Sequence, residues 1–228
     1  MPACFALFDG DGGSALLLSE GCRSIVLDTA ADPVRVFDVV ERALAAGNWV
    51  ALAADYALGA SLEPILAKPP TGRTLLRAWV FEQAEWLDPP MVHTFLAEQV
   101  AGLPEYQRLA GIAELSPGVD AAKHAEQVRQ IGHWIADGDC YQINLTFPLT
   151  FRIYGHPLAL YTRLRERQPV RYGGYIGCGQ EAILSFSPEL FFERSGSRVV
   201  TRPMKGTAPR GDTPLADQER RAALLASA

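Results

Sequence analysis

The sequence predicts an α+β fold in which antiparallel β-sheets are flanked by helices. The stretch from 172 to 202 holds four short segments of β-type composition separated by turns, which is typical of antiparallel strands. Apolar residues at three- and four-residue spacing after Asp120 predict a long amphipathic helix just before that region. With 228 residues, 48% of them apolar, the chain can bury a core and form one large domain or two small ones.

Strands in the first half are expected where short apolar runs lie between turn residues. They cover Ser14–Val26, divided at Glu20-Gly21, and the buried segments Trp49–Ala54 and Leu75–Phe81. The segment Pro64–Gly72 between the last two carries proline and glycine, and we expect it to be a loop.

One helix is expected in the first half, opened by Asp32-Pro33 and followed by Gly47 as a C-cap. The signals between Trp86 and Ser116 are mixed, because prolines and glycines interrupt what otherwise resembles a helix. We place a linker near Gly111–Gly118.

In the second half, the amphipathic helix ends at Asp137-Gly138. A strand is expected over Cys140–Phe151 and a helix over Pro157–Arg167. An antiparallel meander and a last helix from near Leu215 follow. The meander strands are expected at Tyr172–Ile176, Ala182–Ser187, Leu190–Glu193 and Arg198–Arg202.

Charge and cysteine content narrow the possible functions. The formal charge of -5 argues against a nucleic-acid surface, which needs a clustered basic face. The four cysteines (Cys4, Cys22, Cys140 and Cys178) form no C-x-x-C pair, so neither a zinc site nor a disulfide framework is suggested, and we expect four reduced thiols. The N-terminus has no basic leader, and no apolar run is long enough to span a membrane, so we expect a soluble, cytoplasmic protein.

Two residues are candidates for catalysis. Lys205 follows a strand end and precedes a Gly-Thr turn, with Arg202 and Arg210 close in sequence. A lysine beside other cations and partly desolvated becomes a nucleophile near neutral pH. Glu189 lies in Ser187-Pro188-Glu189, where it can act as a general acid if burial raises its pKa. The alternative interpretations are a solvated lysine in a turn and a strand-end glutamate that faces water. Without further evidence, the positions of Lys205 and Glu189 in the sequence favour these alternatives over catalytic roles.

Other polar clusters are less specific. Alternation over Asp139–Thr146 places Gln142, Asn144 and Thr146 on one face of the expected strand, where they line either a polar pocket or the solvent side of an edge strand. The four histidines show no metal-ligand spacing. Asp9–Gly13 lacks the continuation of a phosphate or calcium loop, and we interpret it as a hairpin turn.

Three ordered motifs together resemble the chorismate-utilising enzymes. They are GDCYQINLT at 138–146, AILSFSPELFF at 182–192 and TRPMKGTAPRG at 201–211. The resemblance implies antiparallel sheets flanked by helices around a central cleft, the chorismate-binding fold. Isochorismate and salicylate synthases carry lysine where this chain has Gln142, and anthranilate synthases carry alanine where it has Lys205. The pair is closest to aminodeoxychorismate synthase component I, the large component of para-aminobenzoate synthase.

The resemblance implies a reaction and its residues. Lys205 would add at C2 of chorismate as the C4 hydroxyl leaves, and ammonia would then add at C4 and expel the lysine, giving 4-amino-4-deoxychorismate for the para-aminobenzoate and folate pathway. Glu189 would protonate the departing hydroxyl. Gln142, Gly206 and Thr207 would bind substrate. A glutamine amidotransferase partner would supply the ammonia, because nothing in this chain resembles a glutaminase triad.

The resemblance also implies a division of the chain. Residues 1–115 would be the variable N-terminal region and residues 116–228 the first part of the chorismate-binding domain. The family's second half, with the glutamates that bind Mg2+, would lie outside this chain, so we expect no metal ligands here and an exposed apolar face. Arg171 stands where tryptophan-binding members carry proline. An anthranilate synthase large component and a non-catalytic fragment that retains the fold are the alternatives.

Overall fold

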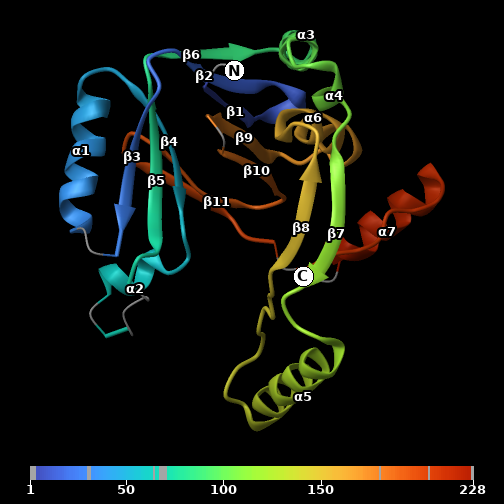
Figure 1. The fold of residues 1–228 in the computed structure, drawn as a ribbon. Coiled ribbons are helices and arrows are strands. Elements are labelled where there is room, and N and C mark those ends of the chain that lie inside the picture. Colours follow the sequence, from blue (N-terminus) through green and yellow to red (C-terminus); the bar gives the residue numbers. More distant parts are fainter. Residues whose placement is uncertain are drawn as a thin grey trace.

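The computed structural model describes residues 4–29, 32–63, 65–66, 71–179, 181–204 and 206–226. These residues form a mixed α+β fold with several antiparallel sheets and seven α-helices, which confirms the predicted fold class (Figure 1). The elements in chain order are β1 (Phe5–Asp9), a 3-10 turn (Asp11–Gly13), β2 (Ala15–Ser19), β3 (Arg23–Asp28), α1 (Pro33–Ala45), β4 (Trp49–Ala54), α2 (Leu58–Leu62), β5 (Thr74–Phe81), β6 (Gln83–Leu87), α3 (Pro89–Ala101), α4 (Glu105–Arg108), β7 (Gly111–Pro117), α5 (Ala121–Asp137), β8 (Leu149–Tyr154), α6 (Pro157–Arg167), β9 (Tyr172–Cys178), β10 (Glu181–Ser187), β11 (Leu190–Ser195), β12 (Arg198–Arg202) and α7 (Pro214–Ala226).

A five-stranded antiparallel sheet, in the order β10-β9-β1-β2-β6, lies at the centre of the fold. Because successive side chains of a strand point to opposite faces, β1 contributes to two cores. Phe5 and Leu7 pack with Val92 of α3 and Tyr161 of α6. Ala6 packs on the other face with residues of the second sheet, such as Trp79. The central sheet is therefore covered on both sides.

The second sheet has three strands in the order β3-β5-β4. Its far face packs against α1 through Leu27, Val40 and Leu76, with Leu58 of α2 at the same core. The resulting order of layers is α3 and α6, the five-stranded sheet, the three-stranded sheet, and α1. Strands from both sides of the boundary expected at residue 115 share the five-stranded sheet, and the boundary itself stays a prediction.

The helices begin where the sequence supplies caps. Asp32, Asp88 and Asp120 each accept a hydrogen bond from a backbone N–H in the first turn of α1, α3 and α5. Pro89-Pro90 looked like an interruption in the sequence, but these prolines occupy the first helical positions of α3, where a missing N–H costs nothing. Gly138 ends α5 with φ +84°, as expected for a left-handed C-cap.

Two predictions of local structure were wrong. Gly111–Gly118 is not a linker, because Gly111–Pro117 forms β7 and pairs with β8, for example through Ile112 and Ile153. A register shift with Glu114 at φ +54° breaks the alternation that would have revealed the strand. Cys140–Phe151 is not one strand: the regular strand starts only at Leu149, and 140–148 is irregular, with no described pairing to a neighbouring strand.

The expected meander is only partly present. β9 pairs with β10 and β11 pairs with β12, as predicted, but the two hairpins belong to separate sheets. Part of the expected loop Pro64–Gly72, namely Pro64 and residues 67–70, lies outside the described residues. The hairpin turn at Asp9–Gly13 and the helices α1, α5, α6 and α7 lie where the sequence predicted them.

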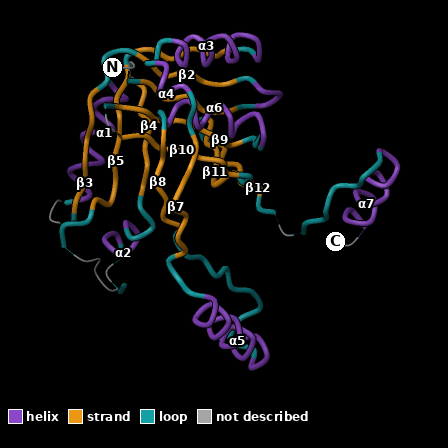
Figure 2. The backbone as a smooth tube through the Cα atoms, turned by 45° about the vertical axis from the view of Figure 1, so that its right-hand side comes forward, coloured by secondary structure: helices purple, strands orange, loops and turns teal. Residues whose placement is uncertain are grey.

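Helices α5 and α7 project from the layered body in both views (Figures 1 and 2). No side chain of α5 is buried, and neither is any described side chain of α7. Large apolar side chains are exposed on both helices, such as Val128 of α5 at 49% and Leu215 of α7 at 67%, and also elsewhere, such as Phe191 of β11 at 88%. This confirms the predicted exposure of apolar surface. None of the described helices is both long enough and apolar enough to cross a membrane.

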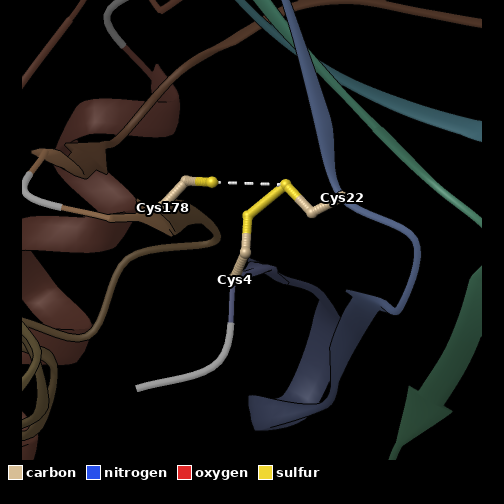
Figure 3. Close-up of side chains that lie close together, drawn as sticks. All are labelled: Cys4, Cys22 and Cys178. Atoms are coloured by element: carbon tan, nitrogen blue, oxygen red, sulfur yellow. Dashed lines mark hydrogen bonds between the residues drawn. A yellow bond between two sulfur atoms is a disulfide. The ribbon is translucent and has the colours of Figure 1, made fainter. Parts of the chain in front are cut away.

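The expectation of four reduced thiols was wrong. Cys4 and Cys22 form a disulfide with a Cα–Cα distance of 6.2 Å, and Cys178 lies against it (Figure 3). Cys140 and Cys178 are free. Cys4 directly precedes β1, Cys22 directly precedes β3 and Cys178 ends β9, so the three lie far apart in the sequence and no short motif could have predicted the cluster.

Candidate functional site

The two motifs with catalytic candidates meet at one hairpin. Glu189 lies in the turn between β10 and β11, and the segment that leads to Lys205 follows β12. Antiparallel pairing of β11 with β12 places Leu190 opposite Arg202. The start of β11 and the end of β12 therefore lie side by side, and the motifs around Glu189 and Lys205 become neighbours although sixteen positions separate them in sequence.

Hydrogen bonds fix the Glu189 turn. The Ser187 hydroxyl donates to the carbonyl oxygen of Glu189 at 3.0 Å. The backbone N–H of Met204 donates to Oε1 of the Glu189 side chain, also at 3.0 Å. Glu189 is thus an exposed carboxylate that holds the backbone of the residue directly before Lys205. Lys205 itself lies outside the described residues.

A shallow hollow of about 330 Å³ opens beside this carboxylate. Its lining combines the acid with apolar and hydroxyl groups: Glu189, Leu190, Phe191, Thr201 and Pro203. Apolar surface next to a single carboxylate suits a small ring that carries a hydroxyl, because the ring can stack on the apolar wall while the acid reaches the hydroxyl.

Gly206 and Thr207 belong to an exposed segment that leads to α7. A Cβ atom at Gly206 would lie 3.0 Å from the Leu224 side chain, so the backbone runs close to α7. Further along, the Gly211 N–H and the Arg210 guanidinium both donate to Oδ1 of Asp217, at 2.9 and 2.7 Å. These hydrogen bonds, that of Gly211 first, lower the pKa of Asp217. Helix α7 therefore anchors the segment that follows Lys205.

Gln142 is not brought to this hairpin by any described contact. It is exposed in the irregular segment between α5 and β8. Among the residues that the structure covers, no hydrogen bond or ion pair joins Gln142 to Glu189, Gly206 or Thr207. The face that alternation assigned to Gln142, Asn144 and Thr146 also does not form, because the segment is not a strand.

The described part of the chain offers no oxygen-ligand set for magnesium. Its only group of three or more metal-ligating side chains is the cysteine cluster Cys4, Cys22 and Cys178. Thiol sulfur is a soft ligand, whereas Mg2+ takes oxygen ligands in octahedral geometry. These residues do not fit magnesium, and a magnesium site elsewhere stays a prediction.

Sequence reasoning missed a polar network with buried side chains where β1 ends, at the same end of the central sheet as Ser187. Asp9 accepts hydrogen bonds from Arg165 Nε at 2.7 Å and from the Tyr161 hydroxyl at 3.1 Å. Burial, and next the Asp9 charge, raises the pKa of Tyr161 far above its usual value. Arg171, noted in the sequence for replacing a proline, forms an exposed ion pair with Asp11 nearby.

The comparisons with known proteins agree with one another: one family pattern and several component 1 synthases resemble this chain. The sequence pattern described as chorismate binding enzyme matches residues 38–228. Among curated proteins, the anthranilate synthase component 1 of Thermus thermophilus is 38% identical over 105 residues, which are 46% of this chain and 23% of that protein. The aminodeoxychorismate synthase component 1 of Salmonella typhimurium is 34% identical over 97 residues, 42% of this chain and 21% of that protein. That of Escherichia coli is 33% identical over 106 residues, 46% and 23%. The chain thus matches less than a quarter of the length of each of these relatives.

Proposed function

Because the chain belongs to the chorismate binding enzyme family, we propose that it carries the nucleophile of an enzyme that aminates chorismate to 4-amino-4-deoxychorismate. The nucleophile is Lys205, within Pro203–Thr207. One observation supports this most directly: the Glu189 carboxylate accepts the N–H of Met204, the residue before Lys205. This contact holds an acid beside the backbone that precedes Lys205, and an acid and an amine are the two groups that the reaction needs.

The chemistry follows from these two groups. The Lys205 amine forms a bond to C2 of chorismate and loses a proton, while both ring double bonds shift and the C4–oxygen bond breaks. Glu189 gives that oxygen a proton, so it departs as water. Ammonia then bonds to C4 and loses a proton, both double bonds shift back, and the lysine nitrogen takes up a proton and leaves as a free amine. A covalent intermediate divides one difficult substitution into two easier ones.

The remaining candidates have supporting roles in this proposal. Gly206 lets the backbone run close to α7, and Thr207 offers a hydroxyl for a substrate carboxylate. Gln142 would provide an amide where water-activating relatives carry lysine. Ammonia would come from a glutamine amidotransferase partner, and the magnesium ligands would come from outside this chain, so no step here runs through a metal.

Anthranilate synthase is the second candidate, favoured by the 38% identity to the component 1 enzyme of Thermus thermophilus. It differs in needing no covalent lysine. A fragment that retains the fold without catalysis is the third candidate. Lys205 in its motif supports the first candidate over anthranilate synthase, and the presence of Lys205, Glu189 and Gln142 together supports it over the non-catalytic fragment.

Intact-protein mass spectrometry separates the three. The native protein is incubated with chorismate and magnesium without ammonia. The expected product is a protein heavier by one chorismate less one water, with the adduct on the peptide that contains Lys205. The sequence contains only three lysines, Lys68, Lys123 and Lys205, so the assignment is direct. Lys205→Ala removes the adduct. Lys123→Ala, at an exposed α5 position, is the matched control and retains it.

The other results select the alternatives. Anthranilate formed after ammonia is added, with no adduct at any stage, would establish anthranilate synthase. Neither adduct nor product would leave the non-catalytic fragment. Glu189→Gln tests the acid separately: an amide oxygen can still accept the Met204 N–H, so the turn is kept while the proton donor is lost. The adduct should then form at least about a hundredfold more slowly, the low end of the contribution of a general acid.

A further inference from the structure

Three sulfur atoms lie close together where β1 begins and β9 ends, at one end of these two interior strands of the central sheet (Figure 3). The ligand atoms of Cys4, Cys22 and Cys178 all lie within 4.8 Å of one another, and the Sγ atoms of Cys22 and Cys178 are 3.3 Å apart. All three side chains are half-buried. In the structure, Cys4 and Cys22 form a disulfide and Cys178 is a free thiol.

Strand pairing holds these cysteines together. β1 pairs with β9 so that Phe5 lies opposite Gly177, and the same register brings Cys4, one residue earlier, beside Cys178, one residue later. Cys22 directly precedes β3, after the turn that carries the chain from the five-stranded to the three-stranded sheet. The cluster therefore joins the two sheets at a point where the backbone is already fixed.

The surroundings of the cluster are apolar. All three cysteines pack against the core between the two sheets, which includes Trp79 and Phe81. Burial raises the pKa of the Cys178 thiol. A thiolate at this place needs a compensating positive charge close to the sulfur, and a bound cation supplies it.

We propose that Cys4, Cys22 and Cys178 form a three-thiolate site for a thiophilic divalent cation, filled when a thiol reductant has opened the Cys4–Cys22 disulfide. Reduction by two thiols, or by one dithiol, breaks the Cys4–Cys22 sulfur–sulfur bond. It gives two protein thiols and one oxidised reductant. Binding of the cation then displaces the thiol protons to solvent as three sulfur–metal bonds form.

The geometry suits zinc. Zinc–sulfur bonds of about 2.3 Å in a tetrahedral arrangement place the sulfurs about 3.8 Å apart, within the 4.8 Å limit observed here. Three protein ligands leave a fourth position for solvent or a small ligand. Oxidation of Cys4 and Cys22 removes two of the three ligands, so occupancy follows the redox state of the disulfide.

Metal titration of the intact chain tests the site. The protein is reduced with a dithiol, freed of metal and reductant under anaerobic conditions, and titrated with Zn2+ in competition with a coloured chelator. One zinc per chain should bind. Cys4→Ser, Cys22→Ser and Cys178→Ser should each weaken zinc binding at least about tenfold, because even the loss of a group that only hydrogen-bonds to a metal ligand weakens metal binding by this factor. Cys140→Ser is the matched control, because Cys140 is also half-buried but lies outside the cluster, and it should bind zinc as the wild type does.

Titration with Co2+ gives a readout that needs no variant. Three thiolates should produce a strong charge-transfer band in the near ultraviolet, and it should disappear when the disulfide is reformed with a mild oxidant. Absence of zinc binding by the reduced protein would overturn the site. Unchanged binding in Cys178→Ser would also overturn it, as would equal loss in Cys140→Ser. Capture of Cys178 in a disulfide with Cys4 or Cys22, without any zinc binding, would show instead that the cluster only exchanges disulfides.

Discussion

The buried carboxylate of Asp9 provides a stability prediction whose size follows from the structure. Its side chain is only 6% exposed, and that of its ion-pair partner Arg165 is 22% exposed. The Tyr161 hydroxyl, on a side chain that is fully buried, donates to the same carboxylate. Asp9→Ala leaves a half-buried guanidinium and a buried hydroxyl without their shared acceptor.

The expected loss is large. Removal of one partner from a buried ion pair costs about 3–5 kcal/mol. Because water still reaches part of Arg165, we expect the low end, about 3 kcal/mol. In a chain of this size, this corresponds to a drop of roughly 6–12 °C in Tm. Tyr161→Phe removes only one hydrogen bond and should cost about 1 kcal/mol.

Asp11 gives the matched control two residues away. It forms an ion pair with Arg171, but the two side chains are 75% and 43% exposed. An exposed pair contributes at most about 1 kcal/mol, so Asp11→Ala should lower the Tm only slightly. Thermal unfolding followed by circular dichroism measures all three variants. If Asp9→Ala and Asp11→Ala lowered the Tm by the same amount, the argument from burial would be refuted.

Two further predictions concern backbone capping and backbone conformation. Burial lowers the pKa of His156 below its usual 6.5, and its Nδ1 accepts the N–H of Leu158 at the start of α6. The unfolded chain therefore binds a proton more tightly than the folded one, so this contribution to stability is complete above pH 6.5 and is lost as the pH falls below it. His156→Ser, a cap that does not titrate, should flatten that part of the stability curve in urea unfolding at several pH values; an unchanged slope would contradict the assignment. Gly155 and Gly138 both have positive φ, +74° and +84°, so alanine at either should cost about 1–2 kcal/mol in backbone strain. Only at Gly155 would the new Cβ also collide with the carbonyl oxygen of Leu109, whereas nothing lies within 4 Å at Gly138. Gly155→Ala should therefore lower the Tm further than Gly138→Ala, and the reverse order would count against the described turn.

The sequence predicted the limits of several helices correctly, because the residues that start and end a helix lie within or next to it in the chain. Asp32-Pro33 fixes the start of α1 through a side-chain cap and a preset φ angle, and Gly47 adopts the left-handed conformation that follows its end. Helix α6 covers the predicted residues Pro157–Arg167. The prolines of α3 misled the prediction because the same residue breaks a helix in its interior and favours one at its first turn.

Non-local pairing explains the wrong assignments. β7 is a strand because β8, more than thirty residues later, supplies its hydrogen bonds, and a bulge hides its alternation. The segment 140–148 has a strand-like composition but no described strand pairs with it. Strand composition states only that a segment fits a sheet, whereas the presence of a partner depends on the rest of the chain.

By itself, the sequence determined the family motifs, the candidate pair Lys205 and Glu189, and most helices, because each depends on residues close together in the chain. Only the tertiary structure placed Glu189 against the N–H of Met204, since the pairing of β11 with β12 sets that contact. It alone also gathered Cys4, Cys22 and Cys178, since their proximity depends on the pairing of β1 with β9. Contacts between distant segments depend on strand register, and register is fixed by the burial of whole sheet faces rather than by any short motif.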